Sequence, residues 1–200
     1  MKLLLATHNH NKLLELKLYL SDHPEYEVFT LDEVGIYDDV EETGSTFLEN
    51  ALIKARWAFQ RSGLISLADD SGLEIRALNN EPGIYSARYL GSDTPYETKN
   101  ALILERMQHH QDRFAQFTSV VAIVYNATLE EAYEGIMPGN ISMSPKGSNG
   151  FGYDPIFIPD GQDLSYAEMS SIHKNSLSHR GKAFRKAIKA LNERLKHETF

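Results

Sequence analysis

The sequence predicts an α/β fold with a mixed sheet. Short apolar segments typical of strands alternate with amphipathic segments typical of helices, and two long strand-like segments follow each other in the middle of the chain. No internal repeat or low-complexity tract interrupts the 200 residues, a length that suits one domain with a large core. We therefore expect residues 1–200 to form a single domain.

The first part of the chain predicts a strand and two helices. Residues 2–6, Lys-Leu-Leu-Leu-Ala, are mostly apolar and predict a strand, followed by a polar loop. Residues 12–20 fit both strand alternation and helical spacing, but they are rich in Leu, Glu and Lys and lack β-branched residues, which favours a helix. The capping box Thr46-Phe47-Leu48-Glu49 opens the next helix, and Gly63 ends it.

The middle of the chain predicts two short strands and a third helix. Residues 65–68 predict a buried strand that runs into Asp69-Asp70-Ser71-Gly72, and residues 73–77 predict a second strand. A second capping box, Thr94-Pro95-Tyr96-Glu97 with Pro at the first helical position, opens a helix that extends to about His109.

The last part of the chain predicts a strand pair and a closing helix. Residues 114–125 and 132–144 predict neighbouring strands joined near Asn126. From Ser178 onward, apolar residues at helical spacing predict an amphipathic helix. Neither a glycine fingerprint of a dinucleotide fold nor a P-loop pattern occurs in the sequence.

Composition excludes several classes of protein. The chain has no cysteine, which rules out disulfides, thiolate metal sites and a cysteine nucleophile, and which suits a reducing cytoplasm. A formal net charge of −8 argues against DNA or RNA as a partner, although a single nucleotide could still bind to a local basic cluster. The longest apolar run, residues 120–125, is too short to span a membrane, and the N-terminal apolar run turns polar at Thr7, too early for a signal peptide.

Residues 148–157, Ser-Asn-Gly-Phe-Gly-Tyr-Asp-Pro-Ile-Phe, are the most informative stretch. Two glycines and a proline constrain the backbone, and they surround Phe151, Tyr153 and Asp154. An aromatic ring and a carboxylate in such a loop suit a ligand with a planar ring. The aromatic side chain can stack on one face of that ring, and the carboxylate can hydrogen-bond to its edge. A base or a sugar would both fit, and the alternative is a structural turn.

Two acidic segments suggest a metal. Asp69 and Asp70 follow an apolar strand, and adjacent carboxylates stay ionised most easily beside a cation. Hard oxygen ligands at such a place favour Mg²⁺. The alternative is a solvated turn. Glu41 and Glu42 precede a helix start, where acidic residues are common without any metal.

Two further segments are rich in groups that bind anions. Thr7-x-Asn9-x-x-Lys12 links a strand end to a helix start, where backbone N–H groups and an ammonium can hold phosphate, unless the loop only caps the helix. His8 and His10 in the same loop are insufficient for a metal site. Lys174 and Ser178-His179-Arg180-Gly181 offer many donors before the last helix, which suits phosphates or base carbonyls.

Together these segments resemble the inosine/xanthosine triphosphate pyrophosphatases, enzymes that remove non-standard purine nucleotides. The resemblance runs nearly end to end, and the matching segments occur in the family's order: residues 6–12, 41–44, 47–51, 68–73, 82–89, 147–157 and 178–181. It implies an elongated mixed β-sheet flanked by helices, two lobes with a central cleft, and a homodimer. The implied reaction is Mg²⁺-dependent hydrolysis of ITP, dITP and XTP to the monophosphate and pyrophosphate.

The resemblance also implies a role for each matched position. Asp70 would be the catalytic carboxylate and would bind Mg²⁺ together with Glu42, with Glu41 as a close rival. Ser71 would contact the substrate. The other implied positions bind the two ends of the nucleotide: Thr7, His8, Asn9, His10, Asn11 and Lys12 the triphosphate, and Phe151, Gly152, Tyr153, Asp154, Lys174, His179 and Arg180 the base.

Two positions depart from the family's pattern, and other functions stay open. Many members have glycine where this chain has Asn11, and glutamate where it has His173, but the neighbouring lysines are retained.

A pyrophosphatase for modified pyrimidine or methylated nucleotides is one alternative, a nucleotide-binding sensor without catalysis is another, and a structural dimerisation domain is a third. Donors from His179 and Arg180 would favour O6 of hypoxanthine and xanthine over the amino group of adenine.

Overall fold

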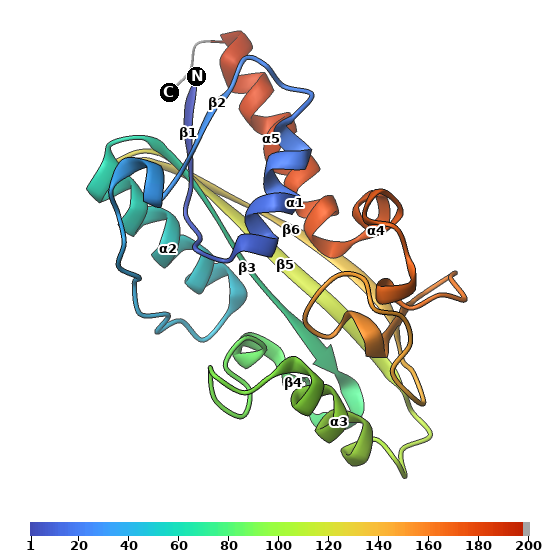
Figure 1. Ribbon diagram of the computed structural model, residues 1–200. Helices are drawn as coiled ribbons and strands as arrows, with labels where there is room; N and C mark the ends of the chain where they lie inside the picture. The colour runs from blue at the N-terminus through green and yellow to red at the C-terminus, as the bar shows by residue number, and fades with distance from the viewer. Residues whose placement is uncertain (198–200) are drawn as a thin grey trace. The chain divides into compact units, whose positions relative to one another are not determined.

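A computed structural model describes residues 1–197 (Figure 1). The chain forms two compact units, each assembled from separate segments. Unit 1 contains Met1–Asp70, Ser119–Gly135 and the chain from Arg180 onward, and unit 2 contains Ser71–Thr118 and Ile136–His179. The predicted α/β class with a mixed sheet is confirmed, whereas the two lobes and the cleft stay predictions.

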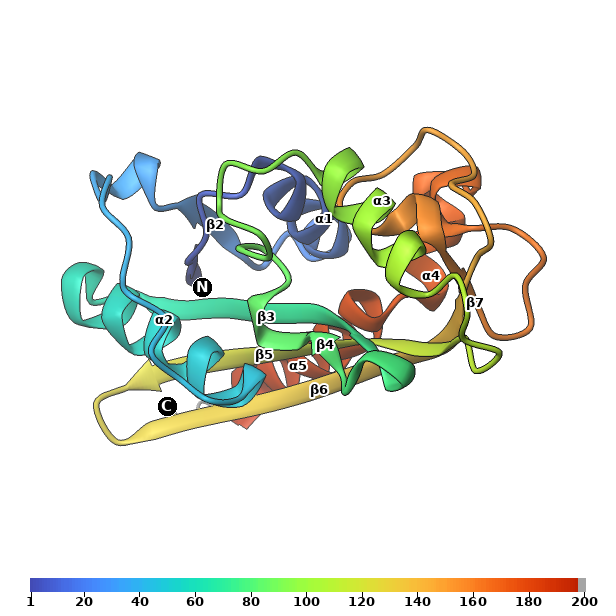
Figure 2. The same cartoon turned by 90° about the horizontal axis from the view of Figure 1, so that it is seen from below.

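The seven-stranded sheet has the order β2-β1-β3-β5-β6-β7, and β4 pairs with β3 off this path. Its strands are β1 Lys2–Leu5, β2 Glu27–Thr30, β3 Ile65–Ile75, β4 Glu81–Pro82, β5 Phe114–Asn126, β6 Leu129–Ile141 and β7 Phe157–Pro159. Strand β1 runs parallel to β2 and β3, whereas β4 is antiparallel to β3 and β7 to β6. The long strands β5 and β6 lie side by side (Figure 2).

Five α-helices occur within residues 1–197. They are α1 His10–Leu20, α2 Phe47–Ser62, α3 Tyr96–Arg106, α4 Ser171–Leu177 and α5 His179–His197. Short 3-10 helices span Asp32–Val34, Arg76–Leu78, Gly83–Tyr85, Asp154–Ile156 and Tyr166–Glu168. Within the part of the chain that is described, no helix has the length and apolar character needed to cross a membrane.

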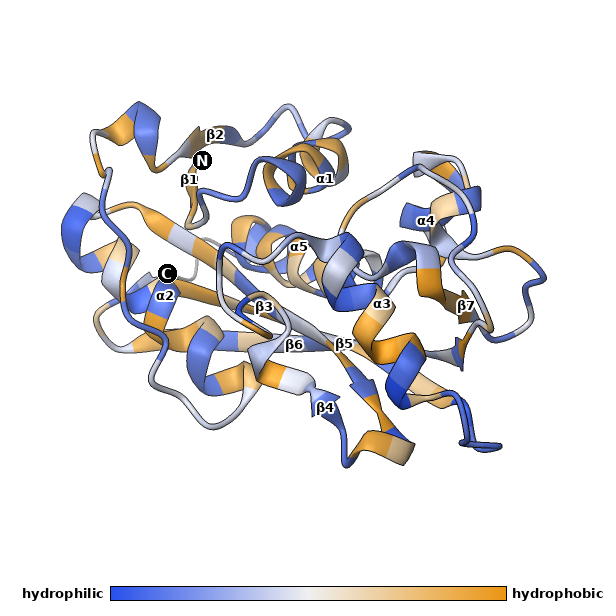
Figure 3. Ribbon diagram, turned by 60° about the horizontal axis from the view of Figure 1, so that its bottom comes forward, coloured by the Kyte–Doolittle hydropathy of each residue, from blue (hydrophilic) through white to orange (hydrophobic). Residues whose placement is uncertain are grey.

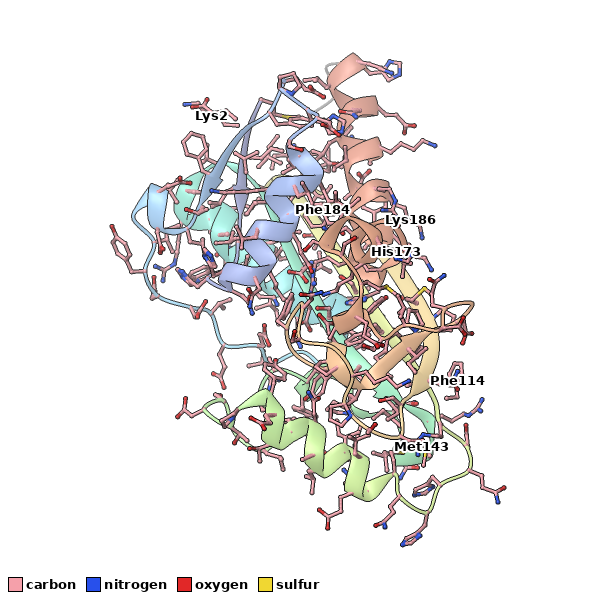
Figure 4. All side chains as sticks on the ribbon, turned by 45° about the vertical axis from the view of Figure 1, so that its right-hand side comes forward. Lys2, Phe114, Met143, His173, Phe184 and Lys186 are labelled. Carbon is pink, nitrogen blue, oxygen red and sulfur yellow. The ribbon has the colours of Figure 1, made fainter. Side chains whose placement is uncertain are left out.

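The core of unit 1 packs α1 and α5 against one face of the sheet. Leu3 and Leu5 of β1 join a buried cluster with Leu16 of α1 and Leu191 of α5. Tyr19 of α1 stacks on Phe184 of α5 with ring centroids 5.6 Å apart. Both helices mix polar and apolar residues (Figure 3), and Phe184 points toward α1 while exposed Lys186 lies on another side of α5 (Figure 4). The N-terminal ends of α1 and α5 lie near β3, because Lys12 and Arg180 both contact Asp69.

The core of unit 2 is aromatic. Phe117 of β5 contacts Phe157 of β7 edge-on at 4.8 Å and stacks on His179 at 4.5 Å. Tyr166 lies beside Phe157, with ring centroids 5.1 Å apart. Phe117, Phe157 and Tyr166 share one buried cluster with Tyr153, so Tyr153 and Phe157 anchor residues 148–157 in the core of unit 2.

The N-cap residue of α2 agrees with the sequence, but the reciprocal half of the predicted capping box does not form, because the Glu49 carboxylate accepts from the Ser45 N–H (2.6 Å). Thr46 accepts a hydrogen bond from the Glu49 N–H (3.1 Å), and Gly63 ends the helix with φ of 67°. The capping box expected at residues 94–97 is wrong, because α3 begins at Tyr96, and the hydroxyl of Thr94 donates to the Leu90 carbonyl (2.6 Å) instead of capping the helix.

Residues 69–72 do not break the strand. Strand β3 runs without interruption from Ile65 to Ile75, so the two short strands and the intervening turn predicted here are wrong. Asp, Ser and Gly disfavour strands by themselves, but tertiary partners override such propensities. Asp69 and Asp70 are only 2% and 6% exposed, which also excludes the solvated turn.

Candidate active site

Strand β3 places two adjacent carboxylates on opposite faces of the sheet in unit 1. Successive side chains along a strand alternate in direction, so Asp69 and Asp70 point to different neighbours. Asp69 contacts Lys12 of α1 and Arg180 of α5, whereas Asp70 contacts residues of α2. The sequence neighbours therefore have different direct partners, but the two clusters are close enough for Lys54 to lower the pKa of Asp69 and for Lys12 to oppose the rise in the pKa of Asp70.

The Asp69 cluster is a buried network of charges. One carboxylate oxygen, Oδ2, lies 3.0 Å from Lys12 Nζ and 3.2 Å from Arg180 Nε. Arg180 also donates to Glu15 of α1. Burial by itself favours the protonated acid, but Lys12 and Arg180 hold the pKa of Asp69 well below its usual value. Asp69 is therefore an anion that anchors two cations.

Burial affects the cations of this cluster as well. It lowers the pKa of Lys12, a change that Asp69 only partly offsets. It also disfavours the charged form of Arg180, but Glu15 and Asp69 raise the pKa of its guanidinium above the usual value. An incoming anion beside Lys12 would therefore favour its charged form.

The Asp70 cluster links β3, α2 and the loop before α2. Lys54 Nζ lies 2.7 Å from a Glu42 carboxylate oxygen and 3.3 Å from Asp70 Oδ1. Asn50 Nδ2 donates to Asp70 Oδ2 at 3.2 Å. Burial raises the pKa of Asp70 against the opposing effect of Lys54. The charges of Asp70 and Glu42 in turn outweigh burial and raise the pKa of Lys54.

This cluster favours Glu42 over Glu41 as the partner of Asp70. Glu41 is exposed, whereas the Glu42 carboxylate shares the Lys54 ammonium with Asp70. Among residues 1–197, no group of three or more His, Asp or Glu side chains is arranged to hold a metal ion. Two carboxylates converging on one cation nevertheless suit Mg²⁺, which commonly takes one or two protein carboxylates and completes its shell with water and phosphate.

The loop before α1 presents backbone donors beside Lys12. Asn9 caps the helix by accepting from the Lys12 N–H (3.1 Å), and Thr7 accepts from the Asn9 N–H (3.1 Å). His10 and Asn11 are exposed in the first turn, where N–H groups have no partner within the helix. His8 instead contacts Asp32, at 3.3 Å. The loop therefore offers an anion site through its backbone and Lys12.

In unit 2, the loop before β7 is organised around Asp154. Its Oδ2 accepts from the Phe151 N–H (2.8 Å) and from Lys174 Nζ of α4 (2.7 Å). The Lys174 ammonium also lies over the Phe151 ring, 4.7 Å from its centroid. Gly150 has φ of +73°, and a Cβ there would lie 2.1 Å from Asp154 Oδ2. Glycine is thus required at position 150, and Phe151 and Gly152 stay partly exposed.

The structure gives the other predicted base-site residues different surroundings. Tyr153 is buried and donates its hydroxyl to the Ser86 carbonyl (2.8 Å), so its ring braces the loop from below. His179 is buried against Phe117, and Arg180 belongs to the Asp69 cluster of unit 1. Ser71 follows Asp70 in β3 and is partly exposed. Their roles toward a base or substrate stay predictions.

Comparison with known proteins identifies the family. Residues 3–190 match the Ham1 family. The chain belongs to the Ham1 family. This confirms the family expected from the motifs, because curated relatives of the chain are named dITP/XTP pyrophosphatases.

Relatives of this Ham1 chain are similar over their full length. The dITP/XTP pyrophosphatase of Christiangramia forsetii is 41% identical, with 96% of this chain and 100% of the relative covered. That of Thermus thermophilus is 45% identical, with 96% and 93% covered. Among solved structures, a HAM1 protein from Coxiella burnetii has a TM-score of 0.89 at 40% identity, covering 96% of this chain and 99% of that one. The Staphylococcus aureus Ham1 protein has a TM-score of 0.86 at 38% identity, with both chains fully covered.

Sequence reasoning missed several residues of the candidate site. Lys54, Asn50 and Glu15 have no role in the motif analysis, yet they contact Asp70 or Arg180. Spacing offered a signal, because residues four apart lie on one face of a helix, as Asn50 and Lys54 do. Glu15 lies three positions after Lys12 on α1 and shares its face for the same reason.

Proposed function

We propose that this chain hydrolyses non-standard purine nucleoside triphosphates, namely dITP, ITP and XTP, to the monophosphate and pyrophosphate. Membership of the Ham1 family and full-length similarity to dITP/XTP pyrophosphatases support this proposal. The single observation that carries it is the pair of clusters on β3. Cations for a triphosphate and carboxylates for a metal lie there within one unit.

We assign triphosphate binding to the start of α1 and to the lysines of the two clusters. The N-terminal end of a helix carries partial positive charge and free N–H groups, which attract phosphate. Lys12 and Lys54 add two ammonium groups, and each already contacts a carboxylate that can share it. Asn9 caps α1, and Thr7 accepts from the Asn9 N–H, so these two side chains fix the conformation of the loop.

Glu42 and Asp70 would hold Mg²⁺, which when bound offsets the negative charge of the phosphates and of the leaving pyrophosphate. Without the ion, Lys54 neutralises the same two carboxylates and keeps them converged. Phosphate oxygens attract the Lys54 ammonium as the substrate binds. Lys54 would then change partners between carboxylate and phosphate.

Asp70 is the residue we assign to the attacking water. Its carboxylate is held from two sides, by Asn50 at Oδ2 and by Lys54 at Oδ1. A positioned carboxylate can orient a water toward the α-phosphorus and accept its proton. Attack at this phosphorus releases the monophosphate and pyrophosphate.

We assign base recognition to the loop from Phe151 to Asp154 in unit 2. The Phe151 ring can stack on a base, and backbone N–H groups and Lys174 can donate to O6 of hypoxanthine or xanthine. Adenine has a donor at this position, so one group would be left unpaired. Each buried unpaired polar group costs about 1–3 kcal/mol, which lets a few contacts reject ATP strongly.

The Ham1 resemblance further suggests a homodimer, and the absence of cysteine is consistent with a cytoplasmic location. Neither DNA nor RNA is expected as a partner, because the formal net charge is −8.

The test is pyrophosphate release by purified protein with Mg²⁺ across dITP, ITP, XTP, ATP, GTP, dTTP and modified pyrimidine triphosphates. We expect rapid release from the inosine and xanthosine nucleotides and little from the others. Preference for the pyrimidine nucleotides would assign the chain to a different substrate class. Tight nucleotide binding without release from any substrate would indicate a sensor and refute the proposal.

A further inference from the structure

Asn50 is a fully buried polar residue in the first half of α2, and the mechanism above gives it no chemical step. Its exposed fraction is 0%. Asparagine is a weaker helix former than alanine or leucine, and burying an amide is unfavourable unless its groups are hydrogen-bonded. A polar side chain at this position therefore needs hydrogen-bond partners that offset the unfavourable free energy of its burial.

Asn50 has two such partners, one from each side of the proposed metal site. Its Oδ1 accepts from the Gly44 N–H at 2.9 Å, and its Nδ2 donates to Asp70 Oδ2 at 3.2 Å. The orientation of the amide is determined by chemistry, because a backbone N–H can only donate and the carboxylate accepts. Asn50 thus ties the loop that carries Glu42 to the strand that carries Asp70.

The contact with Gly44 leaves no room for a side chain. A Cβ at position 44 would lie 2.6 Å from Asn50 Oδ1 and 2.7 Å from Glu49 Cβ. The backbone two residues after Glu42 is therefore pressed against the start of α2. This close approach fixes where the loop leaves the site.

Asn50 and Lys54 hold the same carboxylate in different ways. Lys54 binds Asp70 Oδ1 and Glu42 by charge, so a divalent cation or a phosphate group competes for these contacts. Asn50 is neutral and binds Asp70 Oδ2. It can therefore keep the carboxylate in place when Lys54 changes partners.

We infer that Asn50 is a positioning residue that sets the spacing of Asp70 and Glu42 for a divalent cation. It acts through its hydrogen bonds to Asp70 and to the Gly44 backbone, and not as a metal ligand itself. The inference rests on the proposed function for its role in the reaction. Residues that orient metal ligands typically change metal affinity about 10–100-fold when they are mutated.

The test compares two variants with a control on the same helix. Asn50→Leu removes both hydrogen bonds while keeping the number of side-chain heavy atoms, and Gly44→Ala forces a Cβ against Asn50 Oδ1 and Glu49 Cβ. Ala55→Gly is the control, because Ala55 is buried in α2 and the change costs about 1 kcal/mol of helix stability without altering the two hydrogen bonds. If Asn50→Leu does not fold, Gly44→Ala still tests the inference.

The first readout is the affinity for Mn²⁺ of the protein without nucleotide. Binding is measured as the decrease in the electron paramagnetic resonance signal of free Mn²⁺. The second is the Mg²⁺ concentration that gives half-maximal pyrophosphate release at saturating dITP. We expect both to shift by about 10-fold or more in the folded variants and to stay near the wild-type values in Ala55→Gly, with KM for dITP little changed.

Mn²⁺ affinity in the folded variants equal to that of the wild type, an equal shift in Ala55→Gly, or a wild type that binds no Mn²⁺ would each overturn the inference. Its failure is distinct from failure of the proposed function. A wild type that releases no pyrophosphate refutes the function, whereas the Mn²⁺ comparison still decides the role of Asn50.

Discussion

Asp69 and Asp70 are adjacent in the chain, yet their chemistry diverges because a strand turns them to opposite faces. Lys12 and Arg180 keep Asp69 ionised, while burial makes Asp70 hold a proton more readily than usual. The sequence could predict that this pair follows an apolar strand segment and suits a cation. It could not predict their separate partners, because Asp69 and Arg180 lie 111 positions apart.

At this scale, Asp70→Asn tests the assignment of the catalytic carboxylate. The amide keeps the size of the side chain but cannot accept the water proton, so we expect kcat for dITP to fall about 10²–10⁴-fold. The affinity for a non-hydrolysable nucleotide should change far less, since the lysines remain. Steady-state kinetics and calorimetric binding check this, and comparable losses in both would contradict the role of Asp70.

Asp69→Asn tests the charge network instead. Removing one partner from a buried ion pair typically costs about 3–5 kcal/mol, so we expect a loss of this size in the free energy of unfolding at pH 7. The pKa of Asp69 is lowered by folding, so its contribution is complete above the unfolded value of about 3.9 and is lost as pH falls below it.

Urea unfolding at pH 7 and at successively lower pH measures this effect. The stability difference between wild type and variant should shrink below about pH 4. Asp22 is exposed, so Asp22→Asn serves as the control. It should change the free energy of unfolding by about 0.5 kcal/mol or less at neutral pH. A difference that is constant with pH would contradict the ionised state of Asp69.

At the scale of elements, helices with local signals were predictable and elements defined by distant contacts were not. The N-cap residue and the end of α2 lie within its own sequence, and both were predicted correctly. The continuous strand β3 was not, because buried cations from α1, α2 and α5 permit acidic residues in its middle. Strands β2 and β7 and helix α4 were missed, since each is short and depends on its neighbours.

The loop before β7 allows a test with a matched control. Gly150 and Gly161 both have positive φ, of +73° and +76°, so alanine at either position costs about 1–2 kcal/mol of backbone strain. Only at Gly150 would the new Cβ collide with Asp154, whereas nothing lies within 4 Å at Gly161. We therefore expect Gly150→Ala to lose more stability and to raise KM for dITP.

Urea unfolding and steady-state kinetics compare these two variants. Gly161→Ala should keep the wild-type KM because its loop does not carry Phe151 or Asp154. Equal effects of the two substitutions on KM would show that the Asp154 contacts do not organise a substrate site.

At the scale of the whole molecule, three strands contribute residues to both compact units. The boundaries between the units fall inside strands β3, β5 and β6, so each unit contains only part of these three strands. The single domain expected from length stays a prediction. It implies one cooperative unfolding transition rather than two.

Chemical denaturation followed by near- and far-ultraviolet circular dichroism tests this. Coincident transitions are expected for a single domain. The helices α1, α2 and α5 of unit 1 contribute strongly to the far-ultraviolet signal, whereas the near-ultraviolet signal combines Trp57 of unit 1 with the aromatic cluster of unit 2. Two separated transitions would show that the units unfold independently and would contradict the single domain.

The most direct test of the central claim is to hydrolyse dITP in ¹⁸O-labelled water and locate the label in the products. If Asp70 directs water to the α-phosphorus, the deoxyinosine monophosphate carries the ¹⁸O and the pyrophosphate carries none. Label in pyrophosphate or orthophosphate would place the attack at another phosphorus, and no hydrolysis at all would contradict the assignment of the site as that of a pyrophosphatase.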